Sequence, residues 1–347
     1  MTATARYFAA LLVAAAWLTL SAFFFTSPSS FVPTPHSSSS LFVAVGWNTS
    51  TKAAVVTTSP DGVTWTQRTA APTTFEEDAV AYGNGLFVAG GFSGTTTPVV
   101  STSPDGINWT SRTPAPATNF FPQSIAYGGG VYVIVGTNNS NVAIVSSSPN
   151  GTTWTQQTSA LASGYDLYGV CYGDGLFVAV GQKTTTPDNG VVETSPNGTT
   201  WTAQTVSTGS AVSLNACYYG DGVFVVVGDT DSGNPVVFTS TNGTSWTSET
   251  PAPATDWLPY SVYYGDGAFV ATGYVGASLS SNGSSWTQES TSVSALGVTY
   301  ANGIFVAVGP AYLGEVPTDW TSPNGSAWTE HAMVPTSNTR IEAVTHN

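Results

Sequence analysis

Short apolar runs and polar turns alternate along this chain in a pattern that recurs about every 45 residues from Leu41 to the C-terminus. Each repeat begins with an aromatic or valine-rich run that ends in glycine, first seen at 41–46, and ends in a turn followed by tryptophan, first seen at 59–65. The seven tryptophans that close the repeats are Trp65, Trp109, Trp154, Trp201, Trp246, Trp286 and Trp328. Repeats of this length, built only from short β-type runs and glycine turns, are typical of β-propellers. The sequence therefore predicts an all-β fold, a seven-bladed β-propeller with four antiparallel strands per blade.

The second repeat shows how four strands fit into one blade. Residues 79–83 and 86–90 flank Asn84-Gly85, and Asn-Gly between apolar runs is the strongest short signal for a β-hairpin. A third strand is expected at 98–103, and a turn at 104–106 leads into a fourth at 108–113. Equivalent segments recur in the other repeats.

The first strands of the repeats share columns of similar residues. One column is apolar and is expected in the core: Val80, Ile125, Val170, Cys217, Val262, Val298 and Val344. The position before it holds only small residues, as expected where inner strands converge on a crowded axis. Two positions after it come six tyrosines and one histidine: Tyr82, Tyr127, Tyr172, Tyr219, Tyr264, Tyr300 and His346. Such regularity indicates a structural rather than a catalytic role.

The repeat region does not begin and end at the boundary of a repeat. The region starts with a second strand at Leu41 and finishes with a first strand, 341–346. We therefore expect the N- and C-terminal strands to share one blade, which closes the ring and removes exposed strand edges.

An apolar segment of a different kind precedes the repeats. Residues 7–25 form an uninterrupted apolar stretch of about nineteen residues behind Arg6, long enough either for a signal peptide or for a membrane span. We expect residues 1–25 to be a signal peptide or an N-terminal membrane anchor, and either alternative places the repeats outside the cell. Residues 26–40, rich in proline and serine, are expected to be a spacer, and 41–347 the propeller.

Charge narrows the range of partners. The chain is 41% hydrophobic and only 7% charged, with a formal net charge of −14. A negative field repels phosphate backbones and anionic lipid headgroups, so we expect no nucleic-acid partner and membrane contact only through residues 7–25. The mostly uncharged polar surface agrees with an exported protein.

The turn before each tryptophan carries a family resemblance. Ser-Pro-Asp-Gly-Val-Thr-Trp at 59–65 and its variants resemble the Asp-box of the BNR-repeat, sialidase-like propellers over residues 41–347. The turn is one residue shorter than the family pattern, and five of the seven copies carry Asn in place of Asp. The resemblance implies a seven-bladed fold in which this box is a folding element on the face opposite any active site.

The resemblance does not extend to catalysis. Sialidases use an arginine triad, whereas the repeats contain only Arg68, Arg112 and Arg340, and the first two are expected on outermost strands. We therefore expect no sialidase chemistry and no catalytic residue. Hydrolysis or lysis of glycosides remains an alternative that needs two convergent carboxylates, and Glu76, Asp78 and Glu342 are the nearest candidates.

Histidines and cysteines give little sign of a metal or redox site. His36, His331 and His346 show no ligand spacing, so we expect no metal and no cofactor. Cys171 and Cys217 fall on the first strands of adjacent repeats, and we expect free buried thiols. A disulfide is the alternative, because adjacent blades present opposite faces to each other and export permits the bond.

The loops that connect one repeat to the next are the candidate binding surface. Two of them are close copies, residues 114–122 and 251–259, and each presents a polar group beside large aromatic residues. A flat ring beside a hydrogen-bonding group suits a sugar or a protein hot spot. The alternative is that the aromatic rings plug the space between blades. The expected binding residues are Asn119, Phe120, Phe121, Asp256, Trp257, Trp47, Glu76 and Asp78.

Together these observations predict an exported, non-catalytic recognition or adhesion protein that binds a glycan or a protein at a cell or virion surface. Two alternatives stay open: an extracellular glycoside hydrolase or lyase, and a structural or assembly subunit of a surface layer or particle.

Overall fold

The computed structural model describes residues 40–94, 96–161, 163–185, 189–209, 211–253, 257–310, 317–335 and 338–347. The propeller unit spans Ser39–Asn347. The predicted signal peptide or anchor at 1–25 and the spacer up to residue 39 lie outside the described residues. Within the described ranges, no helix is long and apolar enough to cross a membrane.

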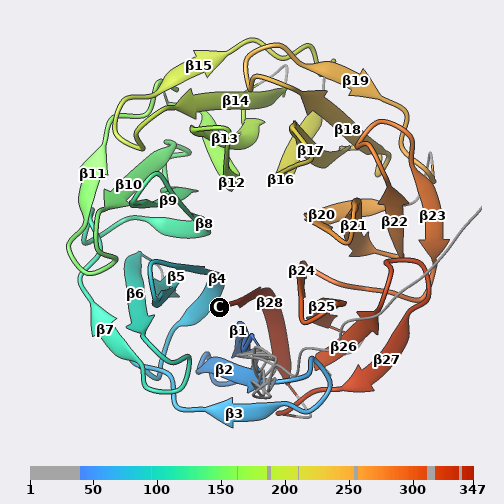
Figure 1. Cartoon of the computed structure of the whole chain (residues 1–347). Helices are drawn as coiled ribbons and strands as arrows, with labels where there is room; N and C mark the ends of the chain where they lie inside the picture. Colours follow the sequence, from blue (N-terminus) through green and yellow to red (C-terminus); the bar gives the residue numbers. More distant parts are fainter. Residues whose placement is uncertain are drawn as a thin grey trace, which may run out of the picture. The chain divides into compact units, whose positions relative to one another are not determined.

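In the part of the chain that the structure describes, twenty-eight strands form seven antiparallel sheets of four strands, arranged as blades around a central channel (Figure 1). The strands of blades 1 to 3 are β4 (Glu76–Gly83), β5 (Leu86–Ser93), β6 (Thr97–Ser103), β7 (Thr110–Arg112), β8 (Phe121–Gly128), β9 (Val131–Thr137), β10 (Ile144–Ser148), β11 (Thr155–Gln157), β12 (Tyr165–Gly173), β13 (Leu176–Lys183), β14 (Gly190–Ser195) and β15 (Thr202–Gln204). Those of blades 4 to 6 are β16 (Val212–Gly220), β17 (Val223–Thr230), β18 (Pro235–Ser240), β19 (Thr247–Glu249), β20 (Leu258–Gly265), β21 (Ala268–Tyr274), β22 (Gly276–Ser280), β23 (Thr287–Ser290), β24 (Gly297–Ala301), β25 (Ile304–Pro310), β26 (Pro317–Ser322) and β27 (Thr329–Ala332). The all-β, seven-bladed architecture is as predicted.

The last blade closes the ring as expected. Its strands are β28 (Thr339–His346), β1 (Phe42–Asn48), β2 (Ala54–Ser59) and β3 (Thr66–Arg68), in that order from the channel outward. β28 pairs antiparallel with β1, so the C-terminal strand supplies the inner strand of the blade in which the N-terminal strands lie (Figure 1).

Two kinds of turn lie on one face, here called the turn face. The hairpins between first and second strands have two left-handed residues, as at Asn84 (φ 45°) and Gly85 (φ 76°). In the tryptophan turns, Asp61 Oδ1 accepts hydrogen bonds from the amides of Val63 (2.9 Å) and Thr64 (2.7 Å). The opposite, connector face carries the loops between blades and between second and third strands.

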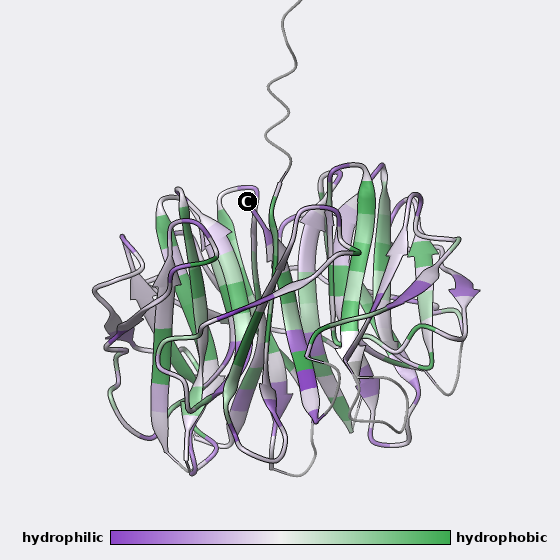
Figure 2. Ribbon diagram, turned by 90° about the horizontal axis from the view of Figure 1, so that it is seen from below, coloured by the Kyte–Doolittle hydropathy of each residue, from purple (hydrophilic) through white to green (hydrophobic). Residues whose placement is uncertain are grey.

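The core lies between neighbouring blades. Each hydrophobic cluster draws buried residues from two adjacent blades, and Figure 2 shows hydrophobic residues along the strands with more hydrophilic turns at the two faces. The tyrosine column has the structural role expected of it. A Cβ added to Gly173 would lie 2.0 Å from the Tyr219 ring of the next blade, so only glycine admits this ring.

Cys171 on β12 and Cys217 on β16 form a disulfide, with 5.7 Å between their Cα atoms. The expectation of free thiols is therefore wrong, and the alternative of a bond between blades is what the structure shows. The two residues differ by one position in the repeat and so point from opposite faces of their strands. Because the two strands are neighbours around the channel, these opposite directions bring the sulfur atoms together.

Candidate ligand-binding site at the channel mouth

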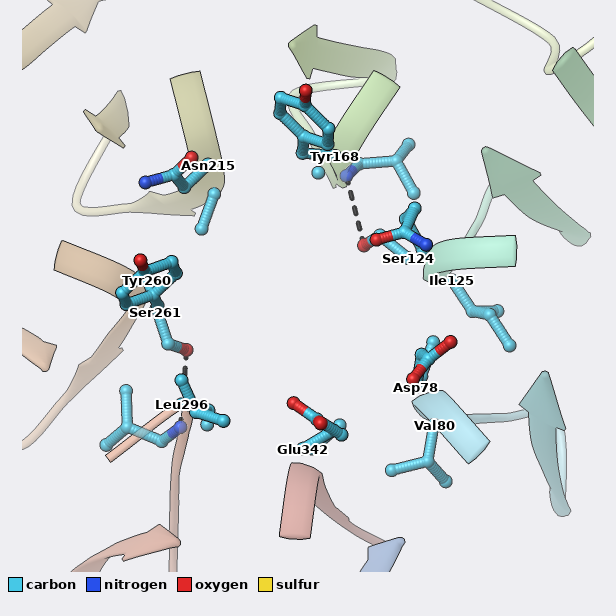
Figure 3. A pocket seen from close by; sticks show the side chains of 18 of the residues that line it. Asp78, Val80, Ser124, Ile125, Tyr168, Asn215, Tyr260, Ser261, Leu296 and Glu342 are labelled. Carbon is cyan, nitrogen blue, oxygen red and sulfur yellow. Dashed lines mark hydrogen bonds between the residues drawn. The ribbon is translucent and has the colours of Figure 1, made fainter. Parts of the chain in front are cut away.

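A β-bulge interrupts the inner strand near the connector face in six blades. In β4, for example, Glu77 pairs with Gly91 and Ala79 pairs with Gly90, so Asp78 between them has no partner on β5. The unpaired residues are Asp78, Gln123, Tyr168, Asn215, Tyr260 and Glu342, and Leu296 stands at the same place immediately before β24. A bulge redirects the side chain of its extra residue. Here these seven residues, called the mouth ring, line the channel at the connector face (Figure 3).

A glycine on the second strand permits each bulge. A Cβ on Gly91 would lie 1.8 Å from the carbonyl oxygen of Glu76. At the other five bulges the distance from such a Cβ to a carbonyl oxygen is 1.8 to 2.0 Å, and at Gly309, opposite Leu296, it is 2.6 Å. The seven glycines are Gly46, Gly91, Gly136, Gly181, Gly228, Gly273 and Gly309. Glycine inside a strand often marks a bulge or a close backbone approach. The glycine that ends the apolar run of every repeat is therefore what positions the mouth ring.

The mouth ring surrounds a cavity of about 510 Å³ that is open to solvent. Phe92, Ser213, Asp229 and Arg340 complete its lining. A narrower cavity of about 170 Å³ continues down the channel between the small and apolar columns of the inner strands. Across its wall, Ser124 Oγ accepts a hydrogen bond from the amide of Val170 at 3.1 Å, which links two blades.

Hydrogen bonds fix several polar side chains around the cavity. Asn215 Nδ2 donates to Asp229 Oδ1 at 2.6 Å and to the carbonyl of Pro259 in the next blade at 3.0 Å. On another side, Tyr168 Oη donates to Gln182 Oε1 at 3.3 Å. Burial, followed by the charge of Asp166, raises the pKa of Tyr168 to about 12, so its hydroxyl stays protonated at neutral pH.

The acidic groups at the mouth have raised pKa values. Burial is the main cause of the raised pKa of Asp78, followed by the charges of Glu342 and Glu76, while Arg340 opposes the shift. Burial also raises the pKa of Glu342, against its ion pair with the Arg340 guanidinium. Asp229 shows the same direction, again from burial and against the Asn215 amide. At the mouth, neighbouring cations and hydrogen-bond donors therefore do not fully offset the cost of burying the ionised carboxyl groups.

Of the predicted binding residues, two are fully buried. Phe120 and Trp257 are both 0% exposed and lie in hydrophobic clusters between blades. The expectation that these rings offer a stacking surface is wrong, because the connectors turn them inward as plugs. Asp256 lies outside the described residues.

The other connector residues stay near the surface. Asn119 has a left-handed backbone (φ 55°), and its Oδ1 accepts a hydrogen bond from the amide of Asn139 at 3.1 Å. Phe121 is half-buried and meets Phe92 edge to face, with ring centroids 5.0 Å apart. Phe92 lines the cavity, so this pair joins one connector to the channel mouth.

Three further predicted binding residues, on the closing blade and blade 1, lie close together: Trp47, Glu76 and Asp78. Lys52 lies over the Trp47 ring at 3.9 Å from its centroid, and its Nζ is 3.2 Å from Glu76 Oε1. Asp78 belongs to the mouth ring beside Glu342 (Figure 3). The structure therefore places Asp78 and Glu342 in one cavity, while Trp47 and Glu76 flank it.

Of the mouth ring, only Asp78 was an expected binding residue, and Glu342 was named only as a candidate catalytic carboxylate. The other five were not predicted from the sequence: Gln123, Tyr168, Asn215, Tyr260 and Leu296. Their signal is present in the repeats. The column two places before the apolar one contains seven residues of six types, whereas its neighbours are uniform, and a glycine in the paired strand indicates a bulge. Within the described residues no cluster of three or more His, Cys, Asp or Glu side chains is arranged to hold a metal ion.

Two overlapping stretches, residues 59–208 and 103–265, match the DUF6242 beta propeller domain, and together they span more than half of the chain. The chain belongs to this family. No curated protein matches its sequence.

Solved structures extend the comparison beyond the family. One similar structure is described as YCF48 bound to D1 peptide (TM-score 0.53, 16% identity, covering 86% of this chain and 90% of that one). Another is the BP39L lectin from Burkholderia pseudomallei (TM-score 0.64, 12% identity, covering 84% of this chain and 95% of that one). At these identities the likeness shows the propeller fold alone.

Proposed function

We propose that this DUF6242 propeller is an exported, non-catalytic recognition protein that binds a glycan or a protein segment at the channel mouth. The observation that carries the proposal is the mouth ring. Seven equivalent positions on a uniform framework hold carboxylate, amide, phenol and aliphatic side chains around one open cavity. Binding sites commonly combine a rigid scaffold with a few varied polar groups in a concave surface.

The chemistry of the cavity suits recognition by hydrogen bonds and ring contacts. Tyr168, Asn215 and Tyr260 offer neutral donors and acceptors together with aromatic surface. The peptide-bound and lectin structures of the same fold support a ligand of one of these two classes. The resemblance of the tryptophan turns to Asp-boxes, without the sialidase arginine triad, supports a role in binding rather than in sialidase catalysis.

Export is part of the proposal. The apolar stretch at 7–25 favours it, and so does the disulfide between Cys171 and Cys217, because such bonds persist in oxidising compartments. We include display at a cell or virion surface in the proposal, because a tethered or secreted propeller would present its rigid binding ring to ligands outside the cell.

The test is a binding screen of the purified full chain against a glycan array and a peptide array, repeated with Tyr260→Ala. We expect a selective ligand whose affinity falls about tenfold or more in the variant, since truncating a central aromatic residue removes both contact area and a hydroxyl. Gln156→Ala, on the exposed outer strand of blade 2, is the control and should bind as the parent does. Ligands that bind the parent and Tyr260→Ala equally would place recognition elsewhere.

Glycoside cleavage is the second candidate, because Asp78 and Glu342 converge in one cavity and both have raised pKa values. A carboxyl group that keeps its proton is suited to act as a general acid toward a glycosidic oxygen. Release of reducing ends from a glycan that binds the array, lost in Glu342→Gln, would favour this activity. Unchanged glycan after prolonged incubation would leave binding as the function.

A further inference from the structure

Asp78 differs from the other acidic residues around the channel mouth in having no donor of its own. Its Oδ2 is shielded from water and accepts no hydrogen bond from the described residues. Each of the other acids has one polar partner: Arg340 for Glu342, the Asn215 amide for Asp229 and Lys52 for Glu76. A shielded carboxylate oxygen without a donor is costly, so a hydrogen-bond donor that binds Asp78 from the cavity would stabilise the folded ring.

The charge of the cavity has the same sign. Its lining contains Asp78, Asp229 and Glu342 against the single cation Arg340. The whole chain adds a formal charge of −14. A positively charged group that enters the mouth therefore gains both from the local carboxylates and from the wider field.

Part of the cavity lining is suited to an apolar stem. Phe92 and Leu296 line the same cavity as the ring of Tyr260. Lysine and arginine bury their methylene groups along such surfaces while their charged ends reach a polar partner. An amino sugar has no methylene stem beside its nitrogen, so Phe92 and Leu296 favour a basic side chain over it.

We propose that the channel mouth recognises a basic side chain, lysine or arginine, of a partner protein, and that its charged nitrogen binds the carboxylate of Asp78. The inference rests on the proposed function and specifies the ligand of that same site. Arg340 remains bound to Glu342 and keeps the second carboxylate from competing for the ligand. Asn215 and Tyr168, on the opposite side of the ring, are placed to accept or donate to the partner's backbone (Figure 3).

The charged and titratable groups that face Asp78 come from several elements. They are Glu76 on its own strand, Arg340 and Glu342 on β28, and Asp229, Tyr168 and Tyr260 across the cavity. Burial raises the pKa of Asp78, so this group ionises at a higher pH than an exposed aspartate does. Affinity for the cation should therefore rise with pH as Asp78 ionises, and level off above its pKa.

The experiment is a saturation-transfer NMR titration of the full chain with Nα-acetyl-lysine amide, Nα-acetyl-arginine amide, the neutral Nε-acetylated lysine amide and glucosamine. We expect saturable, millimolar binding of the two basic amides and at least tenfold weaker binding of the neutral one. Asp78→Asn should lower the affinity for the basic amides about tenfold or more, because a hydrogen bond between charged groups is lost.

The matched control is Asp174→Asn, which removes the same charge from an exposed hairpin on the turn face. Asparagine already occupies the equivalent left-handed position at Asn84 and Asn302, so this variant should fold and bind as the parent does. Equal losses in Asp78→Asn and Asp174→Asn would reduce the effect to net charge and overturn the inference. No saturable binding of basic amides, equal binding of the acetylated amide, or tighter binding of glucosamine would also overturn it.

Failure here is distinguishable from failure of the proposed function. A neutral glycan or peptide that binds the array and is lost in Tyr260→Ala, but not in Asp78→Asn, would keep the mouth as the binding site and remove the basic side chain as its ligand.

Discussion

At the residue scale, the plugging aromatic residues of the connectors make the clearest prediction. Trp257 is fully buried among Val227, Val237 and Phe269, between blades 4 and 5. We expect Trp257→Ala to lower the free energy of unfolding by about 3 to 5 kcal/mol, the usual cost of emptying a large aromatic site. Chemical denaturation measures it. Phe121→Ala, at a half-buried ring, is the control and should cost clearly less. Equal midpoints for the parent and Trp257→Ala would contradict the burial.

The same residues show what sequence reasoning reaches at this scale. The structural role of Tyr82 and its equivalents can be predicted from the sequence, because similar residues recur at the same position of all seven repeats. The direction of the Trp257 ring cannot be read from the sequence, because an aromatic residue in a polar loop can be either exposed or buried between blades. The width of the gap between the two blades determines which of these occurs. The sequence predicts Asp78 from its place near the rim, whereas it predicts Tyr168 and Asn215 only through the repeated glycine that permits a bulge.

At the element scale, the disulfide joins the inner strands of blades 3 and 4, β12 and β16, across 46 residues of chain. A closed loop of this size restricts the unfolded chain, and removing the bond should cost roughly 3 to 4 kcal/mol. We expect a thiol reductant to lower the denaturation midpoint of the parent. Without reductant, the midpoint of Cys171→Ala/Cys217→Ala should already be lower than that of the parent, and reductant should not change it. If reductant leaves the parent unchanged, or if both thiols react with an alkylating agent in the native protein, the strands are not joined.

The spacing of the two cysteines explains why the sequence left their pairing open. They occupy different columns of the repeat, Cys171 one place after the apolar column and Cys217 within it. Repeat alignment alone says that they point to opposite faces of their own strands. Whether these faces meet depends on the distance between neighbouring inner strands, which the ring sets and the repeat does not.

At the scale of the whole molecule, the ring concentrates buried acids between blades. Glu193 and Asp319 are both 0% exposed. Burial raises the pKa of Glu193 to about 7, although Ser159 Oγ and the amide of Ala160 donate to its Oε2 at 2.9 and 2.8 Å. Burial also raises the pKa of Asp319 to about 7, against the smaller opposing effect of the nearby Trp65 indole. Neither carboxyl oxygen of Asp319 has a hydrogen-bond partner among the described residues.

These shifts predict that the propeller is more stable in mildly acidic than in mildly alkaline solution. A carboxyl group with a raised pKa in the folded state favours folding while it is protonated. Its contribution is therefore complete below the unfolded values near 4 and is lost as the pH rises to about 7. For each group the loss is on the order of 2 to 4 kcal/mol, since one pKa unit corresponds to about 1.4 kcal/mol. Thermal unfolding of the full chain at pH 5 and pH 8 measures it.

The variant that isolates this effect is Glu193→Gln/Asp319→Asn, which keeps the shape of both side chains without the ionisable proton. We expect its melting temperature to change much less between pH 5 and pH 8 than that of the parent, and to exceed the parent's at pH 8. Asp174→Asn, at an exposed turn, should keep the parent's pH dependence. If the melting temperature of the double variant changes with pH as much as that of the parent, other buried acids cause the pH dependence. Glu77, whose pKa is also raised by burial, is one of them. A parent that melts at the same temperature at both pH values would show that water reaches these carboxyl groups, and that the blades are packed less tightly around them than the ring described here.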